Sequence, residues 1–161
     1  MVIVYAVKGF EGANLPLDNP LQVPAHRYSG RVLASGKEAV RTTPKFERVR
    51  LLGDVVFVSG TAAIKGEDSE FSEDTRVQAL GAIDVVEHLV APSNISPNCS
   101  AFRFGYLRVY VRRPQDLEPV REMFISHFRD TPIHFLQADI CRPELLLELE
   151  GVGRALPFLR P

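Results

Sequence analysis

The stretch from Phe135 to Val152, FLQADICRPELLLELEGV, constrains the fold of this chain more than any other part of the sequence. It contains an apolar run, a proline-containing break at 142–144 and a run of leucine and glutamate, which together predict two strands that meet at a tight turn. Successive side chains of a strand point to opposite faces, so Glu148 and Glu150 are expected on one face. The alternate leucines from 145 to 149 are expected on the other.

The two glutamates of this closing strand suggest acid–base chemistry. At positions i and i+2 of one strand, Glu148 and Glu150 lie roughly 6.5–7 Å apart. Each carboxylate can raise the pKa of the other where solvent is partly excluded. The alternative interpretation is an exposed strand face with two solvated glutamates, and the strand pattern itself leaves both open.

The composition is that of one globular domain. The 161 residues are 45% hydrophobic and 24% charged with a formal net charge of −1, so the chain can bury a core and offers no strongly basic surface to nucleic acid. No apolar run approaches the roughly 20 residues that span a bilayer, and residues 1–5 lack the basic start of a signal peptide. We therefore expect a cytoplasmic protein without a membrane or nucleic-acid partner, in which Cys99 and Cys141 are free thiols.

Hydrophobic periodicity predicts the remaining elements. Strands are expected at 2–7, 45–50, 55–60 and 102–112, and helices at 73–91 and 116–128. The turn at Gly53-Asp54 joins two of these strands into a hairpin with Phe46 pointing inward, and Asp116 is a suitable N-cap for the second helix. The order of elements predicts an α+β sandwich with both helices on one face of a mainly antiparallel sheet.

Face assignments follow from the same periodicities. The first helix carries apolar residues at helical spacing, namely Val77, Leu80, Ile83, Val86 and Val90, and the stripe of the second is Leu117, Val120, Met123, Phe124 and Phe128. Strict alternation in the long strand places Phe102, Phe104, Tyr106, Arg108 and Tyr110 on one face and Leu107, Val109 and Val111 on the other. Three sheets closing on one another would bury the apolar positions of the uncovered sheet face, which predicts a homotrimer.

Two further segments could contribute to a ligand site. The segment from Tyr28 to Arg41 is basic, and it is either a solvated loop or the source of a guanidinium that binds a substrate carboxylate. Ser59 to Ala63 ends a strand in small residues, which leave room for a ligand or for a closely packed helix. The histidines fall in different elements without ligand spacing, so no metal or other cofactor is expected.

Several of these segments resemble the RidA (YjgF) superfamily over roughly residues 44–154. The matching segments are VFVSGTAAI, the long helix after it, YLRVYVRRPQDLEPVREMF and the closing LLLELEG. The resemblance implies a fold similar to chorismate mutase and a homotrimer with ligand sites between subunits. It divides the chain into an N-terminal extension, residues 1–43, with a short strand and a candidate substrate loop, and a RidA-like domain, residues 44–161.

Within that superfamily the chain resembles the C-terminal half of the chorismatases. The motifs that carry this likeness are 19–28 (NPLQVPAHRY), 59–62 (SGTA) and above all 137–142 (QADICR). Chorismatases cleave the enolpyruvyl ether of chorismate, so the resemblance implies a small carboxylated substrate. Glu148 aligns with the glutamate that the family uses as an acid, and a cysteine at the position of Cys141 is associated with members that make 3-hydroxybenzoate.

The resemblance also implies a set of substrate-binding residues, which comprises Tyr28, Arg41, Thr61, Ala62, His134 and Gln137. Chorismatases are about twice as long as this chain, and Glu38-Ala39-Val40 stands where they have tyrosine, glycine and proline. Two alternatives to a chorismatase-like enzyme therefore remain open. One is a RidA-type 2-iminoacid deaminase in which Glu148 positions water, although His134 stands where that type has arginine. The other is a binding protein of a biosynthetic pathway that has no catalytic activity.

Overall fold

The computed structural model describes residues 7–30, 44–70 and 73–158, and its main feature is a six-stranded sheet with the order β1-β2-β3-β8-β6-β7. The strands are β1 (Asn14–Leu17), β2 (Val49–Leu52), β3 (Val55–Thr61), β6 (Cys99–Val111), β7 (Ile133–Gln137) and β8 (Leu147–Pro157). The helices are α2 (Thr75–Leu89), α3 (Pro92–Ile95) and α4 (Leu117–His127), with single 3-10 turns η1 (Ala25–Arg27) and η2 (Pro114–Asp116). A small hairpin, β4 (Ile64–Lys65) and β5 (Asp68–Ser69), forms a second sheet.

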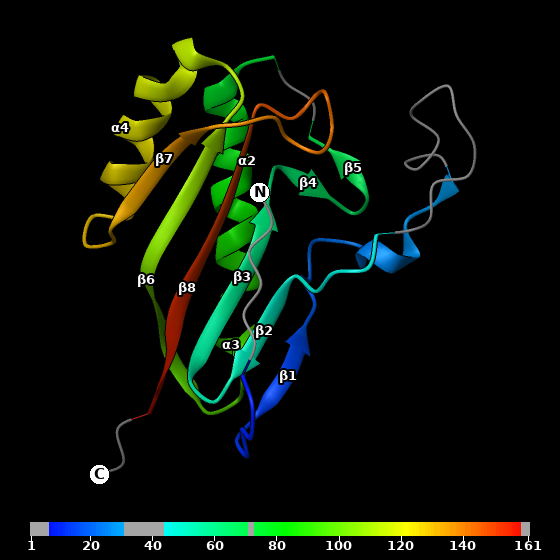
Figure 1. The fold of residues 1–161 in the computed structure, drawn as a ribbon, viewed down its shortest axis with the longest axis vertical. Helices are drawn as coiled ribbons and strands as arrows, with labels where there is room; N and C mark the ends of the chain where they lie inside the picture. The colour runs from blue at the N-terminus through cyan, green and yellow to red at the C-terminus, as the bar shows by residue number, and fades with distance from the viewer. Residues whose placement is uncertain (1–6, 31–43, 71–72, 159–161) are drawn as a thin grey trace.

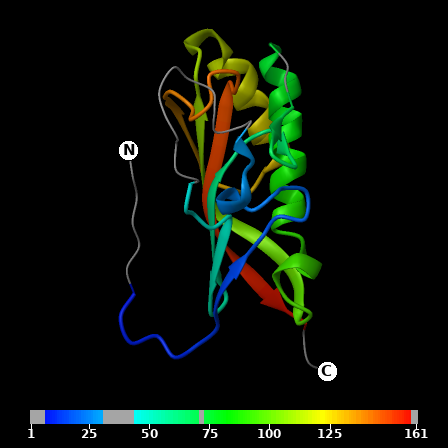
Figure 2. The same cartoon turned by 90° about the vertical axis from the view of Figure 1, so that its right-hand side faces the viewer.

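The sheet is antiparallel except between β6 and β7, which run parallel. Figure 1 shows the strand order, and Figure 2 shows the sheet close to edge-on with α2 and α4 on the same side of it. The predicted α+β sandwich with two helices on one face is therefore confirmed. We call the other side of the sheet the open face.

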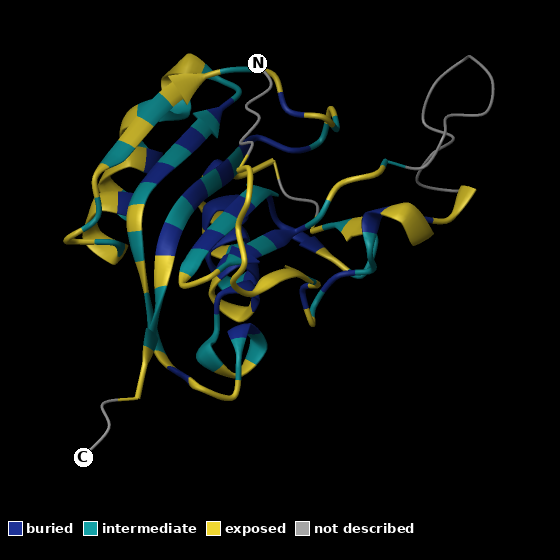
Figure 3. Cartoon of the chain, turned by 60° about the horizontal axis from the view of Figure 1, so that its bottom comes forward, coloured by how far each residue is buried: buried dark blue, intermediate teal, exposed yellow. Residues whose placement is uncertain are grey.

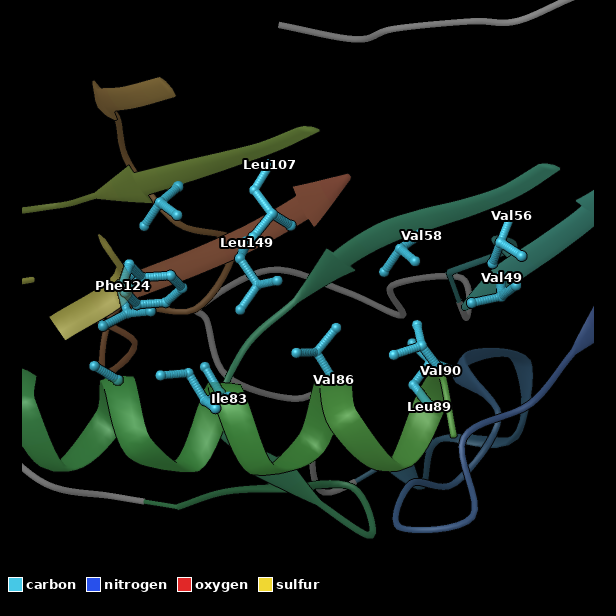
Figure 4. Close-up of a cluster of buried hydrophobic side chains, with 14 of the residues drawn as sticks. Val49, Val56, Val58, Ile83, Val86, Leu89, Val90, Leu107, Phe124 and Leu149 are labelled. Carbon is cyan, nitrogen blue, oxygen red and sulfur yellow. The ribbon is translucent and has the colours of Figure 1, made fainter. Parts of the chain in front are cut away.

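The core lies between the sheet and the two helices. Ile83, Val86 and Leu89 of α2 point at Val58 and Leu149 of the sheet (Figure 4). The predicted stripe of α2 was wrong at its start, because Val77 and Leu80 are 53% and 61% exposed. The stripe of α4 is confirmed, with buried residues at its centre and partly buried ones around them.

Small residues explain why the buried face of α2 differs from the predicted stripe. Ala79 and Ala82 are fully buried there, and alanines let the helix approach the sheet closely. The buried face is therefore rotated toward them and away from Val77 and Leu80.

The N-terminal segment contributes more to the sheet than its composition indicates. Residues 14–17, expected to form only a connection, pair as β1 with β2 at the sheet edge, where Pro16 is tolerated because an edge strand need not donate every amide. Asn19 is buried, and its Nδ2 donates to the Val85 carbonyl of α2 at 2.9 Å. The strand expected at 2–7 falls almost entirely outside the described residues.

The predicted hairpin of β2 and β3 is confirmed, with Gly53 in the turn at a φ of +65°. The inward position predicted for Phe46 is wrong. β2 begins only at Val49, so Phe46 precedes it and is 43% exposed. Its ring packs against the guanidinium of Arg48, with Cζ 4.8 Å from the ring centre.

A bulge in β6 overturns part of its predicted alternation. The register with β8 shifts between Phe104 and Tyr106. As a result, Phe102 and Phe104 pack on the helix side, where the Phe104 ring lies 5.6 Å from that of Phe128. Gly105 lies in the bulge, and an added residue reverses the side to which preceding side chains point.

The closing stretch forms two strands, but they do not pair with each other as a hairpin. β7 and β8 lie on opposite sides of β6, and segment 138–146, which carries no helix or strand, connects them around the end of the sheet (Figure 1). The predicted turn is present, since the Leu145 amide donates to the Arg142 carbonyl at 3.1 Å, but it does not join β7 directly to β8, because both strands pair with β6. The alternation in β8 is confirmed, and Figure 3 shows buried and less buried residues alternating along the strands.

Candidate active site

Glu148 lies on the open face, in the middle of the sheet. Its strand β8 is flanked by β3 and β6, and its register partner on β6 is Tyr110. The neighbouring position on β3 is Gly60, where a Cβ atom would overlap Oε1 of Glu148. The glycine therefore leaves the space that the Glu148 carboxyl occupies.

The surroundings of Glu148 favour its neutral form. Burial raises the pKa of the carboxyl, and the negative charge of Glu150 raises it further, while the positive charge of Arg48 lowers it. The net result is a pKa raised from the ordinary value of a glutamate. This confirms the sequence-based hypothesis of two interacting carboxylates over that of two solvated ones.

Glu150 has a different environment, in which its carboxylate has direct polar partners. Its Oε1 accepts a hydrogen bond from the Tyr110 hydroxyl at 2.5 Å and forms an ion pair with Nε of Arg108 at 2.9 Å. Burial and the bond to Glu150 raise the pKa of Tyr110 to about 12, so its hydroxyl remains a donor at neutral pH. The two carboxyl groups of this strand thus have different surroundings.

Two arginines lie against the ring of Tyr28 and bring positive charge to the site. Arg48 is 4% exposed and donates from Nη2 to the Tyr28 hydroxyl, and Cζ of Arg142 lies 5.4 Å from the centre of the same ring. Arg142 also donates from Nη1 to the Glu67 carbonyl at 2.8 Å. Its Nη2 and the Nε of Arg48 are buried without a hydrogen-bond partner among the described residues.

These unused donors make the pair of arginines a candidate anion site. A buried guanidinium nitrogen without a partner is costly, and a carboxylate is the group that best satisfies it. Arg48 lies close enough to lower the pKa of Glu148, so an anion bound by it would lie beside the acid.

Cys141 is exposed and lies in segment 138–146, close to both Glu148 and Arg142. Partial loss of hydration at the sulfur and the charge of Glu148 raise the pKa of the thiol, while Arg142 lowers it. The thiol is therefore neutral at physiological pH, and Cys141 lacks the depressed pKa of a nucleophilic cysteine.

The structure brings some of the other predicted site residues together. Tyr28 is part of the anion site, and Ala62 lies in a small apolar cluster that Tyr110 also contacts. His134 is exposed on edge strand β7 and pairs in register with Arg108, so it shares the open face with Glu150.

Other predicted residues are placed elsewhere. Thr61 is fully buried, pairs with core residue Leu149 and donates to the Ser59 carbonyl. Gln137 pairs with Val111 of the core, so it is on the opposite face from Glu148. Arg41 lies outside the described residues.

Three residues of the site were not assigned a role from the sequence. Arg48 directly precedes β2, and Gly60 is the last residue but one of β3. Arg142 is within the motif that carries the resemblance. An arginine directly before a buried strand and a glycine within an apolar one were the available signals. Their partners, however, are up to 100 positions away along the chain, and no local pattern reveals them.

A groove on the open face lies over β2 and β3. It has a volume of about 690 Å³ and is lined by residues including His26, Phe46, Phe57 and Ser59. Glu148 is not among its lining residues. The described residues contain no group of three or more His, Cys, Asp or Glu side chains that could hold a metal ion. None of the described helices has the length and apolar character of a membrane span.

Comparison with known proteins identifies relatives of the chain. It is 32% identical over 165 residues to a 3-hydroxybenzoate synthase of Streptomyces hygroscopicus. The alignment covers 94% of this chain and 46% of that protein. The chain is 28% identical to a chorismatase of Streptomyces rapamycinicus, covering 94% of this chain and 47% of that protein. The chain spans about half the length of these curated relatives. No family model matches the sequence.

Comparison with solved structures gives similar proteins. A chorismatase crystal structure superposes with a TM-score of 0.75 at 27% identity, over 88% of this chain and 44% of that one. A YjgF-family protein from Mycobacterium tuberculosis shares the fold alone, with a TM-score of 0.59 at 16% identity, over 89% of this chain and all of that one. The resemblance to chorismatases and to the RidA/YjgF fold is thus confirmed over most of the chain.

Proposed function

We propose that the chain is a chorismatase-like enzyme that acts on chorismate or a related small carboxylated enol ether or cyclic acid, with Glu148 as the general acid. The observation that carries this proposal is the environment of Glu148, whose carboxyl is partly buried, lies beside Gly60 and has a raised pKa. The likeness to a 3-hydroxybenzoate synthase and to chorismatases supports the choice of substrate.

The chemistry requires an acid that is protonated near neutral pH. Transfer of a proton to the methylene carbon of an enolpyruvyl ether forms an oxocarbenium ion, and cleavage of the ether bond then releases pyruvate. General acids work best when their pKa lies near the working pH. Burial and the charge of Glu150 raise the pKa of Glu148 in this direction, and the Glu150 carboxylate, ion-paired with Arg108, lies near the developing cation.

The substrate carboxylates find their partners in Arg48 and Arg142. Each has a buried guanidinium nitrogen available for a carboxylate oxygen, and both lie against Tyr28, which gives them a common support. Arg41 remains a proposed third contact. A planar guanidinium fixes a carboxylate in orientation as well as in position, which is what transfer of a proton to one carbon atom requires.

The identity of the product depends on whether the ring reacts with water. Release of pyruvate with formation of 3-hydroxybenzoate consumes no water, whereas hydrolysis to pyruvate and a dihydrodiol consumes one molecule. We propose the first outcome, with Cys141 as a neutral contact beside the ring. The raised pKa of its thiol supports this role, because a thiolate would compete for the cation. We further propose a cytoplasmic homotrimer with sites between subunits.

Incubation of the purified protein with chorismate, followed by separation of the products, tests the proposal. We expect pyruvate and 3-hydroxybenzoate from the unmodified protein. Glu148→Gln should reduce the rate by about 10²–10⁴-fold, the usual contribution of a general acid. Glu118→Gln is the matched control, since Glu118 is exposed on α4 and forms an ion pair with Arg121.

Two outcomes would contradict the proposal. Full activity of Glu148→Gln would remove this residue from catalysis. Ammonia release from a 2-iminoacid without cleavage of chorismate would instead assign the chain to the deaminases.

A further inference from the structure

The segment that connects β7 to β8 carries much of the site without secondary structure of its own. Residues 138–146 contain no helix or strand, yet they include Cys141 and Arg142 and lead directly into β8 two residues before Glu148. Backbone carbonyls outside a helix or ladder need other partners when they are shielded from water. The shielded carbonyls of this segment therefore need partners from other parts of the chain.

Arg112 donates several of the hydrogen bonds that hold this segment. It follows the last residue of β6, and its side chain donates to three carbonyls of the segment. Nη2 donates to Ile140 at 2.8 Å and to Arg142 at 2.9 Å, and Nε donates to Leu145 at 2.9 Å. Its backbone amide also donates to the Leu146 carbonyl at 2.8 Å. Only a guanidinium presents donors in a fixed fork that can reach three converging carbonyls.

Gln78 holds the same segment from the helix side. It is 1% exposed and lies on the buried face of α2, where its neighbours are alanine, valine, isoleucine and leucine. Its Nε2 donates to the Glu144 carbonyl at 2.8 Å, and its Oε1 accepts from the Leu146 amide at 2.8 Å. Both ends of this polar side chain in an apolar stripe are thereby hydrogen-bonded to one stretch of backbone.

We propose that Arg112 and Gln78 are positioning residues of the active site, which together fix the backbone of residues 140–146 and so the places of Cys141, Arg142 and Glu148. Arg142 shows the consequence most clearly. Its carbonyl is held by Arg112 and its Nη1 by the Glu67 carbonyl, and this leaves Nη2 as the nitrogen available to a ligand. Neither Arg112 nor Gln78 is required to contact the substrate.

The effect of these residues on catalysis rests on the proposed function, but their effect on the segment does not. The test therefore combines kinetics with hydrogen exchange of residues 138–146, measured on Arg112→Ala and on Arg121→Ala as the matched control. Arg121 is half-exposed on α4 and forms an i,i+3 ion pair with Glu118. Arg112→Lys, which keeps the charge but not the fork, covers the case in which Arg112→Ala does not fold.

In Arg112→Ala we expect amide exchange in 140–146 to rise about tenfold or more, as for loss of at least one charge-assisted hydrogen bond, while exchange in α2 and β6 stays unchanged. We expect kcat to fall about 100-fold with a smaller change in KM, because a misplaced acid slows the chemical step more than binding. Added guanidinium ion should restore part of kcat in Arg112→Ala and leave Arg121→Ala unaffected. Arg112→Lys should show the same local exchange to a lesser degree.

Unchanged exchange in 140–146, or an equal increase in all elements, would overturn the proposal, because Arg112 would then have no local effect or only a general one. The proposal would also be overturned if the unmodified protein is an active enzyme and Arg112→Ala leaves kcat per folded molecule unchanged. If the unmodified protein leaves chorismate intact while the local exchange rises as expected, the proposed function fails and the fixing of the segment stands.

Discussion

Glu148 and Glu150 are identical side chains two positions apart on one strand, and their neighbours give them different properties. Arg108 and Tyr110 both bind Glu150 directly, whereas Glu148 is partly buried beside Gly60 with only the charge of Arg48 to favour its ionised form. The sequence predicts that the two carboxyls share a face, because strand alternation is local. It does not predict that the surroundings of Glu148 raise its pKa, because Arg48 and Gly60 lie on a distant hairpin.

The coupling between the carboxyls predicts a shift in pH dependence. Glu150→Gln removes a negative charge that raises the pKa of Glu148 and also frees Arg108, so the pKa of Glu148 should fall. The acid is active when protonated, so the decline of kcat/KM with rising pH should begin at a lower pH in the variant. Rate profiles of this variant and of Glu118→Gln measure it. A decline at the same or a higher pH would show that Glu150 does not tune the acid.

At the scale of elements, the strength of local patterns decides what the sequence predicts. The β2–β3 hairpin and helices α2 and α4 follow from turn residues and periodicity, and the structure confirms them. The pairing of β7 and β8 with β6 depends on contacts that no window contains, and the sequence therefore suggests a hairpin that does not form. The bulge at Gly105 and the edge strand β1 were missed for the same reason.

The close approach of β3 and β8 at Gly60 gives a test at this scale. In Gly60→Ala the new methyl group overlaps the end of the Glu148 side chain, which can rotate away, so the fold should persist with only a small change in Tm. Activity should nonetheless fall by about 100-fold, because the acid is displaced. Gly105→Ala is the control, since its Cβ meets only the Val152 carbonyl oxygen at 3.4 Å. Equal activity in both variants would show that the space at Gly60 is not needed.

At the scale of the whole molecule, one face of the sheet is covered by helices and the other is open. The open face carries the site residues Glu148 and Glu150, the groove over β2 and β3, and partly buried apolar residues such as Phe57 and Val152. A face with both apolar and charged groups suits an interface that contains a ligand site. This mixture of groups supports the proposed homotrimer.

Light scattering coupled to size-exclusion chromatography measures this assembly. We expect a mass three times that of the 18.0 kDa chain. Phe57→Asp, on the open face, should shift the population toward monomer and reduce activity in parallel, while Val77→Asp on the exposed side of α2 should do neither. A monomer with full activity would show that one chain contains the complete site.

The most direct test of the central claim is turnover of chorismate in D₂O with analysis of the pyruvate released. If Glu148 delivers its exchangeable proton to the methylene carbon, the methyl group of pyruvate should carry one deuterium, and Glu148→Gln should release pyruvate at least about 100-fold more slowly. Pyruvate without deuterium, or labelled pyruvate formed equally fast by Glu148→Gln, would contradict the assignment of Glu148 as the acid.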